Sequence, residues 1–161
     1  MQRSLWMFVA VGVIIIWATS LSNAVQSIPS RLVGSWYAGS GFTSVPYNPA
    51  TGQWGRPSGK GLVYIFRADG SYTKAFQSYN SSGGCTNGFT AFEHGVMQAN
   101  ATQLYLHPTS GQMQVRDSCV SSLNEDKPIS VSDELFTWEF TAEGLYLQRS
   151  DGAASTFRPL E

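Results

Sequence analysis

The clearest feature of this sequence is a rapid alternation of apolar and polar residues from about residue 30 to its end. Between residues 134 and 141, for example, Phe136, Trp138 and Phe140 alternate with Thr137 and Glu139. Because successive side chains of a strand point to opposite faces, this period of two predicts strands with one buried face. No stretch beyond residue 30 has a helix-forming composition.

Turn residues separate the alternating runs and indicate a topology. Asp-Gly pairs at 69–70 and 151–152 are hairpin signals, since Gly accepts a positive φ at little cost. A stretch with Pro and Gly at 108–111 is a further predicted turn. Neighbouring strands usually pair, and closing such a meander removes its free edges. We therefore expect an all-β fold, an antiparallel up-and-down barrel of eight to nine strands over residues 30–161.

The first 25 residues form a separate unit. Arg3 precedes an apolar run over 5–18, and small polar residues then lead to a cleavage motif ending at Ala24. As a helix this run spans roughly 21 Å, short of the about 30 Å of a bilayer core, although an extension through Val25 reaches it. A cleaved signal peptide and an N-terminal hydrophobic helix anchoring residues 5–25 in a membrane both fit. Either predicts an extracytoplasmic domain, in a periplasm, at a cell surface or in a secretory lumen.

Charge and cysteine content narrow the partners and the compartment. With ten basic and eleven acidic residues, the chain has no excess positive charge to attract nucleic acid. In an oxidising compartment Cys85 and Cys119 have one intramolecular pairing, and neither has a second Cys or His at metal-ligand spacing. We therefore expect a structural disulfide. Asn80 and Asn100 begin sequons in predicted turns and are glycosylation sites if the host is eukaryotic.

Residues suited to catalysis are few. We expect His94 and His107 to be structural, and no nucleophile-elbow motif accompanies them. The strand carboxylates Glu93 and Glu139 are expected on a solvated outer face. No phosphate-binding loop, zinc spacing or calcium loop occurs. The sequence therefore predicts a protein that is not an enzyme and needs no cofactor or metal.

Aromatic residues mark two candidate binding regions. One is the Gly- and Pro-rich loop over 39–61, whose Phe42, Tyr47 and Trp54 are expected either to contact a partner or to cover the barrel mouth. The other is the inner face of the barrel. Eight strands enclose either a filled core or one small ligand, and so many large rings favour a filled interior. The candidate contacts on this inner face are Tyr64, Tyr72 and Trp138, beside Phe66 and Phe76.

Gly34-Ser35-Trp36, on a first strand entered from a short turn, resembles the Gly-x-Trp signature of lipocalins and related calycins. The resemblance implies a lipocalin-like barrel whose Trp36 plugs the closed end beneath an arginine from near the last strand. Arg149 and Arg158 are both placed to be that structural arginine, and a guanidinium on an indole face stabilises by ~0.5–2 kcal/mol. The chain departs from the family in lacking a Thr-Asp-Tyr-like second motif and a C-terminal helix.

A broader set of motifs runs through residues 34–119. They are Gly34-x-Trp36, Pro46-Tyr47-Asn48-Pro49, Tyr64-x-Phe66, Asp69-Gly70, Cys85, Phe92-Glu93-His94-Gly95, Leu104-x-Leu106-x-Pro108, Gly111 and Cys119. Their order and spacing resemble the lumenal domain of the fungal endoplasmic-reticulum chaperone family implicated in cell-wall glucan synthesis. This resemblance implies a paired Cys85–Cys119 and a non-enzymatic, protein-assisting role.

These observations favour a noncatalytic accessory or assembly protein, chaperone-like, that acts at a membrane surface. Its expected partner is a membrane protein or protein complex on the extracytoplasmic face. The alternative is a lipocalin-type carrier of a small apolar ligand, which requires an interior void of at least ~300 Å³. An extracytoplasmic hydrolase is a distant third reading, which requires a nucleophile within hydrogen-bond reach of a histidine in a cleft.

Overall fold

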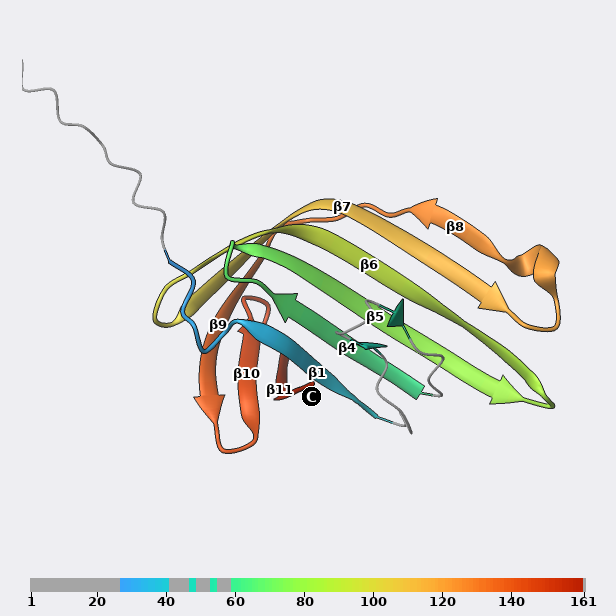
Figure 1. Cartoon of the computed structure of the whole chain (residues 1–161), viewed down its shortest axis with the longest axis horizontal. Helices are drawn as coiled ribbons and strands as arrows, with labels where there is room; N and C mark the ends of the chain where they lie inside the picture. Colours follow the sequence, from blue (N-terminus) through green and yellow to red (C-terminus); the bar gives the residue numbers. More distant parts are fainter. Residues whose placement is uncertain (1–26, 41–46, 49–52, 55–58, 161) are drawn as a thin grey trace, which may run out of the picture.

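A computed structural model describes residues 27–40, 47–48, 53–54 and 59–160 and shows an all-β fold, as expected (Figure 1). The helical element among these residues is the short 3-10 helix η1, Ser121–Leu123. In this part of the chain no helix has the length and apolar character needed to cross a membrane. The strands are β1 Gly34–Ser40, β2 Tyr47–Asn48, β3 Gln53–Trp54, β4 Gly59–Phe66, β5 Ser71–Ser82, β6 Cys85–Ala99, β7 Gln103–Asp117, β8 Glu125–Pro128, β9 Glu134–Thr141, β10 Gly144–Arg149 and β11 Ala154–Pro159.

Two expectations fall wholly or partly outside the described residues. The signal peptide or anchor over 1–25, with its hydrophobic helix, lies outside them, as does Phe42. Tyr47 and Trp54 are placed opposite each other by the register of the small β2–β3 hairpin. The roles given to these segments stay predictions.

The main sheet closes on itself in chain order. Hydrogen-bonded neighbours run β1-β4-β5-β6-β7-β9-β10-β11, and β11 pairs back with β1, so that eight strands form a ring. The ninth strand, β8, is added to the far half of β7. All these pairings are antiparallel, which is the up-and-down order expected when strands adjacent in the chain pair.

Unequal strand lengths distinguish this sheet from the regular barrel expected. β5, β6 and β7 have 12, 15 and 15 residues, whereas β9, β10 and β11 have 8, 6 and 6. The three long strands therefore run beyond the ring, with β8 along one edge of their extension (Figure 1). We call this extension the arm; it comprises residues 76–82, 85–93, 111–117 and β8.

Residues 108–111 continue β7 instead of forming the expected turn. The pairing with β6 shifts between His94 and Gly95, and Thr109 is the extra residue on β7. The Thr109 hydroxyl donates to the His94 carbonyl at 3.2 Å. Because a β-bulge absorbs one residue and bends its strand, Pro and Gly here bend a continuous strand where the arm leaves the ring.

Aromatic and aliphatic side chains fill the ring. Tyr64 is 1% exposed, and its ring centroid lies 5.3 Å from those of Phe66 and Phe157 and 6.3 Å from that of Phe136. Such stacked and edge-on pairs add to the stabilisation that burial gives. The ring therefore encloses a packed core at this level. Its other members are Leu32, Trp36, Tyr72, Met97, Ala99, Leu104, Leu106, Leu145 and Leu147.

The opposite face of β4 and β5 is buried as well. Val63 and Ala75 alternate with the core residues and so point away from the ring interior, yet they are 1% and 0% exposed. Gln77 on the same face is 1% exposed, and its amide nitrogen and oxygen have no hydrogen-bond partner. Alternation predicts a single buried face, so this second layer is a feature that the sequence pattern did not indicate.

Candidate functional site

The inner face of the arm carries a row of half-buried apolar side chains. The register places Phe76 opposite Ala91, and Ala91 opposite Met113. One step nearer the tip, Phe89 lies opposite Val115, and its ring is 5.6 Å from that of Phe76. Because alternate residues of a strand share a face, this row continues the ring's core outward along the arm. We call these five residues the inner row.

The inner row remains partly exposed because the short strands end before it. β9 begins at Glu134, β10 ends at Arg149, and β11 begins at Ala154. β8 adds only Glu125 and Lys127 to the same face, where they form an ion pair of 3.1 Å. A partly exposed apolar face framed by polar residues is a candidate docking surface. The inner row is therefore our candidate binding site.

Charged residues separate the inner row from the ring's core. Lys74 Nζ lies 2.8 Å from Glu134 Oε2 and 3.2 Å from Glu93 Oε2, and Arg149 Nη1 lies 3.5 Å from Glu134 Oε1. The side chains of Lys74, Glu93 and Glu134 are only 16%, 18% and 11% exposed. The expectation of an outer-face Glu93 is wrong, because Lys74 lies directly opposite it on the inner face and neutralises it. We call these four residues the mouth cluster.

A pocket of about 180 Å³ opens beside the mouth cluster, and we call it the mouth pocket. This volume is enough for one large side chain but below the ~300 Å³ of a small-molecule site. The residues lining it are Leu62, Tyr64, Lys74, Glu134, Phe136, Arg149, Ala153, Ala154, Ser155 and Phe157.

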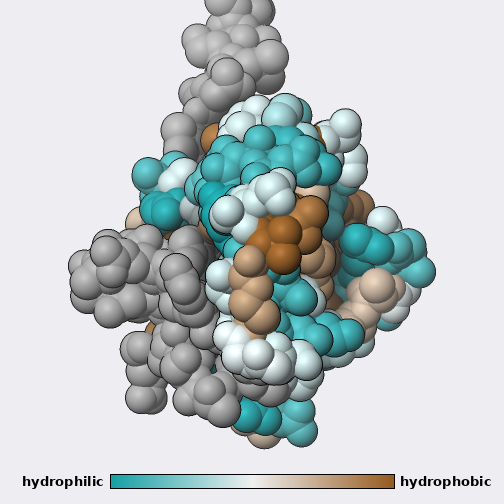
Figure 2. All heavy atoms as spheres, turned by 90° about the vertical axis from the view of Figure 1, so that its right-hand side faces the viewer, coloured by the Kyte–Doolittle hydropathy of each residue, from teal (hydrophilic) through white to brown (hydrophobic). Residues whose placement is uncertain are grey.

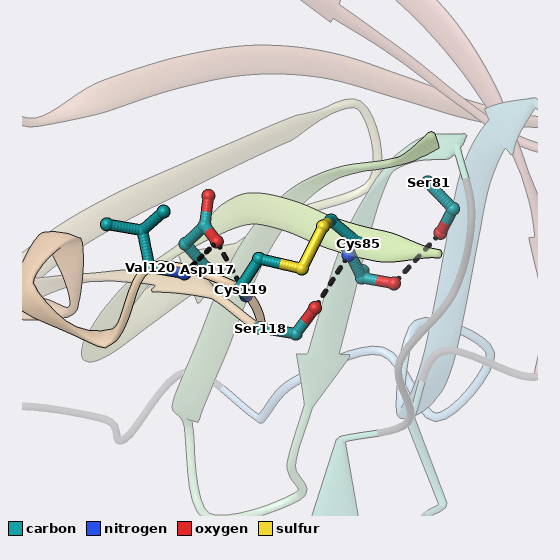
Figure 3. Close-up of a disulfide and its surroundings, with 7 residues drawn as sticks. Ser81, Cys85, Asp117, Ser118, Cys119 and Val120 are labelled. Carbon is teal, nitrogen blue, oxygen red and sulfur yellow. Dashed lines mark hydrogen bonds between the residues drawn. A yellow bond between two sulfur atoms is a disulfide. The ribbon is translucent and has the colours of Figure 1, made fainter. Parts of the chain in front are cut away.

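A disulfide closes the tip of the arm, which confirms the expected pairing (Figure 3). Cys85 opens β6, Cys119 follows β7, and their Cα atoms are 5.5 Å apart. The N–H groups of Cys119 and Val120 donate to Asp117 Oδ1 at 2.8 and 2.7 Å, which fixes the chain beyond the bridge. Across a sequence separation of 34 residues, such a bridge stabilises by about 3–4 kcal/mol in the chain-entropy model.

The loop after the disulfide exposes apolar side chains at the tip. Val120 and Leu123 are 46% and 56% exposed, and both belong to the turn that contains η1. Figure 2, which looks onto this end of the molecule, shows brown apolar surface bordered by teal and white polar surface. The tip thus adds exposed apolar groups to the arm.

Two of the inner-face residues selected from the sequence lie in packed surroundings. Tyr72 is 1% exposed, its hydroxyl has no hydrogen-bond partner, and burial raises the pKa of its phenol well above the usual value. Trp138 Nε1 donates to the carbonyls of Asn100 and Gln103 at 3.0 and 3.2 Å. The first residue fills the core and the second ties β9 to the β6–β7 turn.

Trp36 lies at the end of the ring opposite the arm. Its Nε1 donates to the Leu32 carbonyl at 2.8 Å, and its ring centroid is 5.5 Å from that of Phe140. The guanidinium of Arg31 lies 4.2 Å from the Phe140 ring centroid. A cation–π contact therefore exists at this end of the ring, but it joins Arg31 to Phe140 and not one of the expected arginines to Trp36. The arginines selected from the sequence lie elsewhere: Arg149 in the mouth cluster and Arg158 in β11.

Both sequon asparagines are exposed. Asn80 lies within β5, opposite Asn87, and not in the turn expected for it. Asn100 does lie in a turn, where its Oδ1 accepts the N–H groups of Thr102 and Gln103 at 3.0 and 2.8 Å. Their glycosylation stays a prediction.

The histidines make contacts that differ from a catalytic triad. His94 Nδ1 lies 3.2 Å from Thr73 Oγ1, and His107 Nδ1 lies 2.6 Å from Asp133 Oδ1. Hydrogen bonds from the Tyr105 hydroxyl and from His107 hold the pKa of Asp133 below its usual value. Among the described residues neither pair joins a nucleophile, a histidine and a carboxylate, and no three His, Cys, Asp or Glu side chains are grouped for a metal.

One ion pair beside the mouth pocket predicts sensitivity to acid. Asp151 accepts hydrogen bonds from Arg149 at 2.5 and 3.0 Å and from the Ala153 N–H, which lowers its pKa to about 2. A carboxyl whose pKa is lowered on folding stabilises the fold above its ordinary pKa of about 4 and loses this effect as the pH falls toward 2. We expect Asp151→Asn to lose less thermal stability than the unmodified protein between pH 5 and pH 2.5. Glu143→Gln, elsewhere on the surface, is the control; equal losses in both variants would contradict the assignment.

The fold and a family match together identify the protein. The disulfide and the sheet define an all-β domain of an oxidising compartment. The family model of Rot1, described as a chaperone for protein folding within the ER, fungal, matches residues 32–147. This chain therefore belongs to the Rot1 family. No curated protein and no solved structure matches it.

The family match extends well beyond the motifs that indicated it. The sequence resemblance to the fungal chaperone ended at residue 119, whereas the match continues through β9 and into β10. The lipocalin resemblance is not confirmed. A family of folding chaperones agrees with the expectation of a non-enzymatic protein, and its place within the ER agrees with the expected secretory lumen.

The inner row is the part of the candidate site that sequence reasoning largely missed. The sequence pattern indicated Phe76, but not Phe89, Met113 or Val115. For Met113 and Val115 the reason is that Pro and Gly at 108–111 predict a turn between two separate strands. Reading 103–117 as one strand, with one residue absorbed by a bulge, brings Met113 and Val115 onto the face of Leu106.

Proposed function

We propose that this protein is a noncatalytic folding chaperone of the ER lumen that holds apolar segments of incompletely folded polypeptides against the inner row. The supporting observation is the half-buried apolar face of the arm, left uncovered by the short strands. The family's description as chaperones for folding within the ER supports the same role.

Hydrophobic contact gives such a surface broad selectivity. Burial of apolar area stabilises by roughly 25 cal/mol per Å² and has no directional requirement. Many different unfolded segments therefore fit, and each is released when folding buries its own apolar residues. The disulfide holds β6 and β7 together at the tip, which keeps the apolar face presented when no client is bound.

The dimensions of the inner pocket favour a chaperone over a carrier of small apolar ligands. The mouth pocket has about 180 Å³, less than a carrier site of at least ~300 Å³ requires. A larger hollow of about 500 Å³ lies on the outer side of the arm, but its Arg116 already pairs with Asp126 at 2.6 Å. The Asn124 side chain there accepts the Asp117 N–H at 2.7 Å. Its polar groups thus serve the protein's own loop.

Substitutions in the inner row test this proposal. We expect Phe89→Ser combined with Met113→Ser to raise about tenfold the concentration needed to suppress aggregation of reduced lysozyme, because about 1.4 kcal/mol of contact is lost. Urea unfolding of the double variant measures any loss of stability, because both side chains are partly buried. Val96→Ser, on the outer face of β6 with 50% exposure, is the matched control. Undiminished suppression by the double variant would remove the inner row from the proposal.

Action at a membrane surface forms the second part of the proposal. We propose that the protein's clients or partners include a membrane protein or protein complex on the lumenal side, with residues 5–25 providing a tether if they are not cleaved. The first described residues lie at the end of the ring opposite the arm (Figure 1), so a tether that enters there would leave the arm free to reach clients. Affinity purification from detergent-solubilised membranes should recover such a partner. Recovery of a lone soluble monomer would argue against this part.

A further inference from the structure

The ring contains a seam between β1 and β11. Tyr37 lies opposite Arg158, and the pairing extends over only two residues of each strand. It stops there although β1 continues to Ser40 and β11 reaches back to Ala154. β9 to β11 run steeply across the direction of β1 and β4 in Figure 1, which accounts for the parting of the two strands.

Backbone groups of β11 face this seam. The Arg149 N–H donates to the Ala153 carbonyl at 2.8 Å, which sets the alternation of the antiparallel β10–β11 ladder. By this alternation Ser155 directs its backbone groups toward β10. Ala154 and Thr156 direct theirs away from β10, where no described strand pairs with them. β11 therefore presents a short free edge.

The mouth pocket lies behind the free edge. β11 contributes Ser155 and Phe157 to its lining, β4 contributes Leu62 and Tyr64, and β1 contributes no residue. Side chains of Lys74, Glu134 and Arg149 supply its polar end. An open strand edge and a pocket for one side chain thus occur together at the seam.

We propose that an extended segment of an unfolded polypeptide adds as a strand to the free edge of β11 and places one side chain in the mouth pocket. This inference rests on the chaperone function proposed above and specifies the form in which a client binds. Unpaired backbone donors and acceptors of a strand edge are complementary to another extended backbone, whatever its sequence. Strand addition therefore suits a protein that must accept many clients.

The pocket restricts the side chain that enters it. Apolar walls with a charged end fit a large side chain that has an apolar body and a hydrogen-bonding tip, such as tyrosine. Lys74 and Arg149 face Glu93, Glu134 and Asp151, so the surrounding charges sum to −1 and disfavour an acidic side chain. The client strand is expected to be apolar or aromatic at this position.

Variants of the β11 edge test the inference in the full chain. Thr156→Pro removes the free N–H without touching the bonds to β10, whereas Thr156→Ala retains that N–H and serves as the matched control. Ser155→Phe fills the pocket from its own lining. With fluorescein-labelled, reduced and carboxymethylated α-lactalbumin as the unfolded probe, we expect Thr156→Pro and Ser155→Phe each to bind about tenfold more weakly. Thr156→Ala should bind as the unmodified protein does.

Amide hydrogen exchange of the unmodified protein separates this inference from the chaperone function itself. Strand addition predicts slower exchange at Thr156 and Ala154 when the probe is added. If the protein still suppresses aggregation but these amides gain no protection, and Thr156→Pro binds normally, strand addition is wrong while the chaperone function stands. If the unmodified protein neither binds the probe nor suppresses aggregation, the chaperone function fails first.

Discussion

Replacing Tyr64 by alanine is expected to destabilise the protein by about 3–5 kcal/mol, the range for removing a large aromatic side chain from a packed core. The side chain is 1% exposed and contacts three other aromatic rings, on β4, β9 and β11. The cavity left behind lies where both sides of the ring meet, so neighbouring strands cannot collapse into it freely. Urea unfolding followed by tryptophan fluorescence measures this loss.

Tyr64→Phe is the matched control, because it retains the ring and its packing. We expect this variant to unfold within about 1 kcal/mol of the unmodified protein, the size of one typical hydrogen bond. A loss in Tyr64→Phe as large as that in Tyr64→Ala would show that the hydroxyl, and not the aromatic packing, stabilises the ring.

Replacing Lys74 by methionine is expected to destabilise the protein by about 3–5 kcal/mol, since it leaves the largely buried carboxylate of Glu93 without its cation and that of Glu134 with only the longer contact to Arg149. Lys74 pairs with Glu93 on the neighbouring strand and with Glu134 at the start of β9, so it connects the two sides of the ring at its mouth. The variant should unfold at a lower urea concentration. It should also bind the unfolded α-lactalbumin probe more weakly, because Lys74 lines the mouth pocket.

Neutralising the two glutamates together with Lys74 tests the physical reason for this loss. Adding Glu93→Gln and Glu134→Gln to Lys74→Met removes the uncompensated charges, and we expect the triple variant to recover at least half of the lost stability. If the triple variant were no more stable than Lys74→Met alone, shape complementarity of the lysine stem would be the dominant effect.

The two faces of β4 and β5 show what the alternation of apolar and polar residues can and cannot predict about burial. Leu62, Tyr64 and Phe66 indicated the inner face correctly, because a strand beside a core needs an apolar residue at every second position. The same rule gave no sign that Val63 and Ala75 are buried on the other face. Small and β-branched residues are compatible with either environment, so their burial depends on what packs against them.

Glu93 and residues 108–111 are two places where predictions from neighbouring residues in the sequence were wrong. A lone carboxylate on a strand belongs outside by default, but a lysine directly opposite allows it to face inward. Pro and Gly indicate a turn by default, but a bulge uses them to bend a continuous strand. In both cases the deciding partner lies on another strand.

The all-β class, the chain order of the paired strands, the disulfide and the resemblance to fungal ER chaperones are all predictable from the amino-acid sequence alone. The first three follow from local periodicity, turn residues and an even cysteine count, and the resemblance rests on the order and spacing of motifs along residues 34–119. Three features are visible only in the folded protein: three strands extend beyond the ring as an arm, an apolar row on the arm stays partly exposed, and β1 and β11 separate at a seam. Those features depend on differences in length and register between strands distant in sequence, and no local pattern encodes such differences.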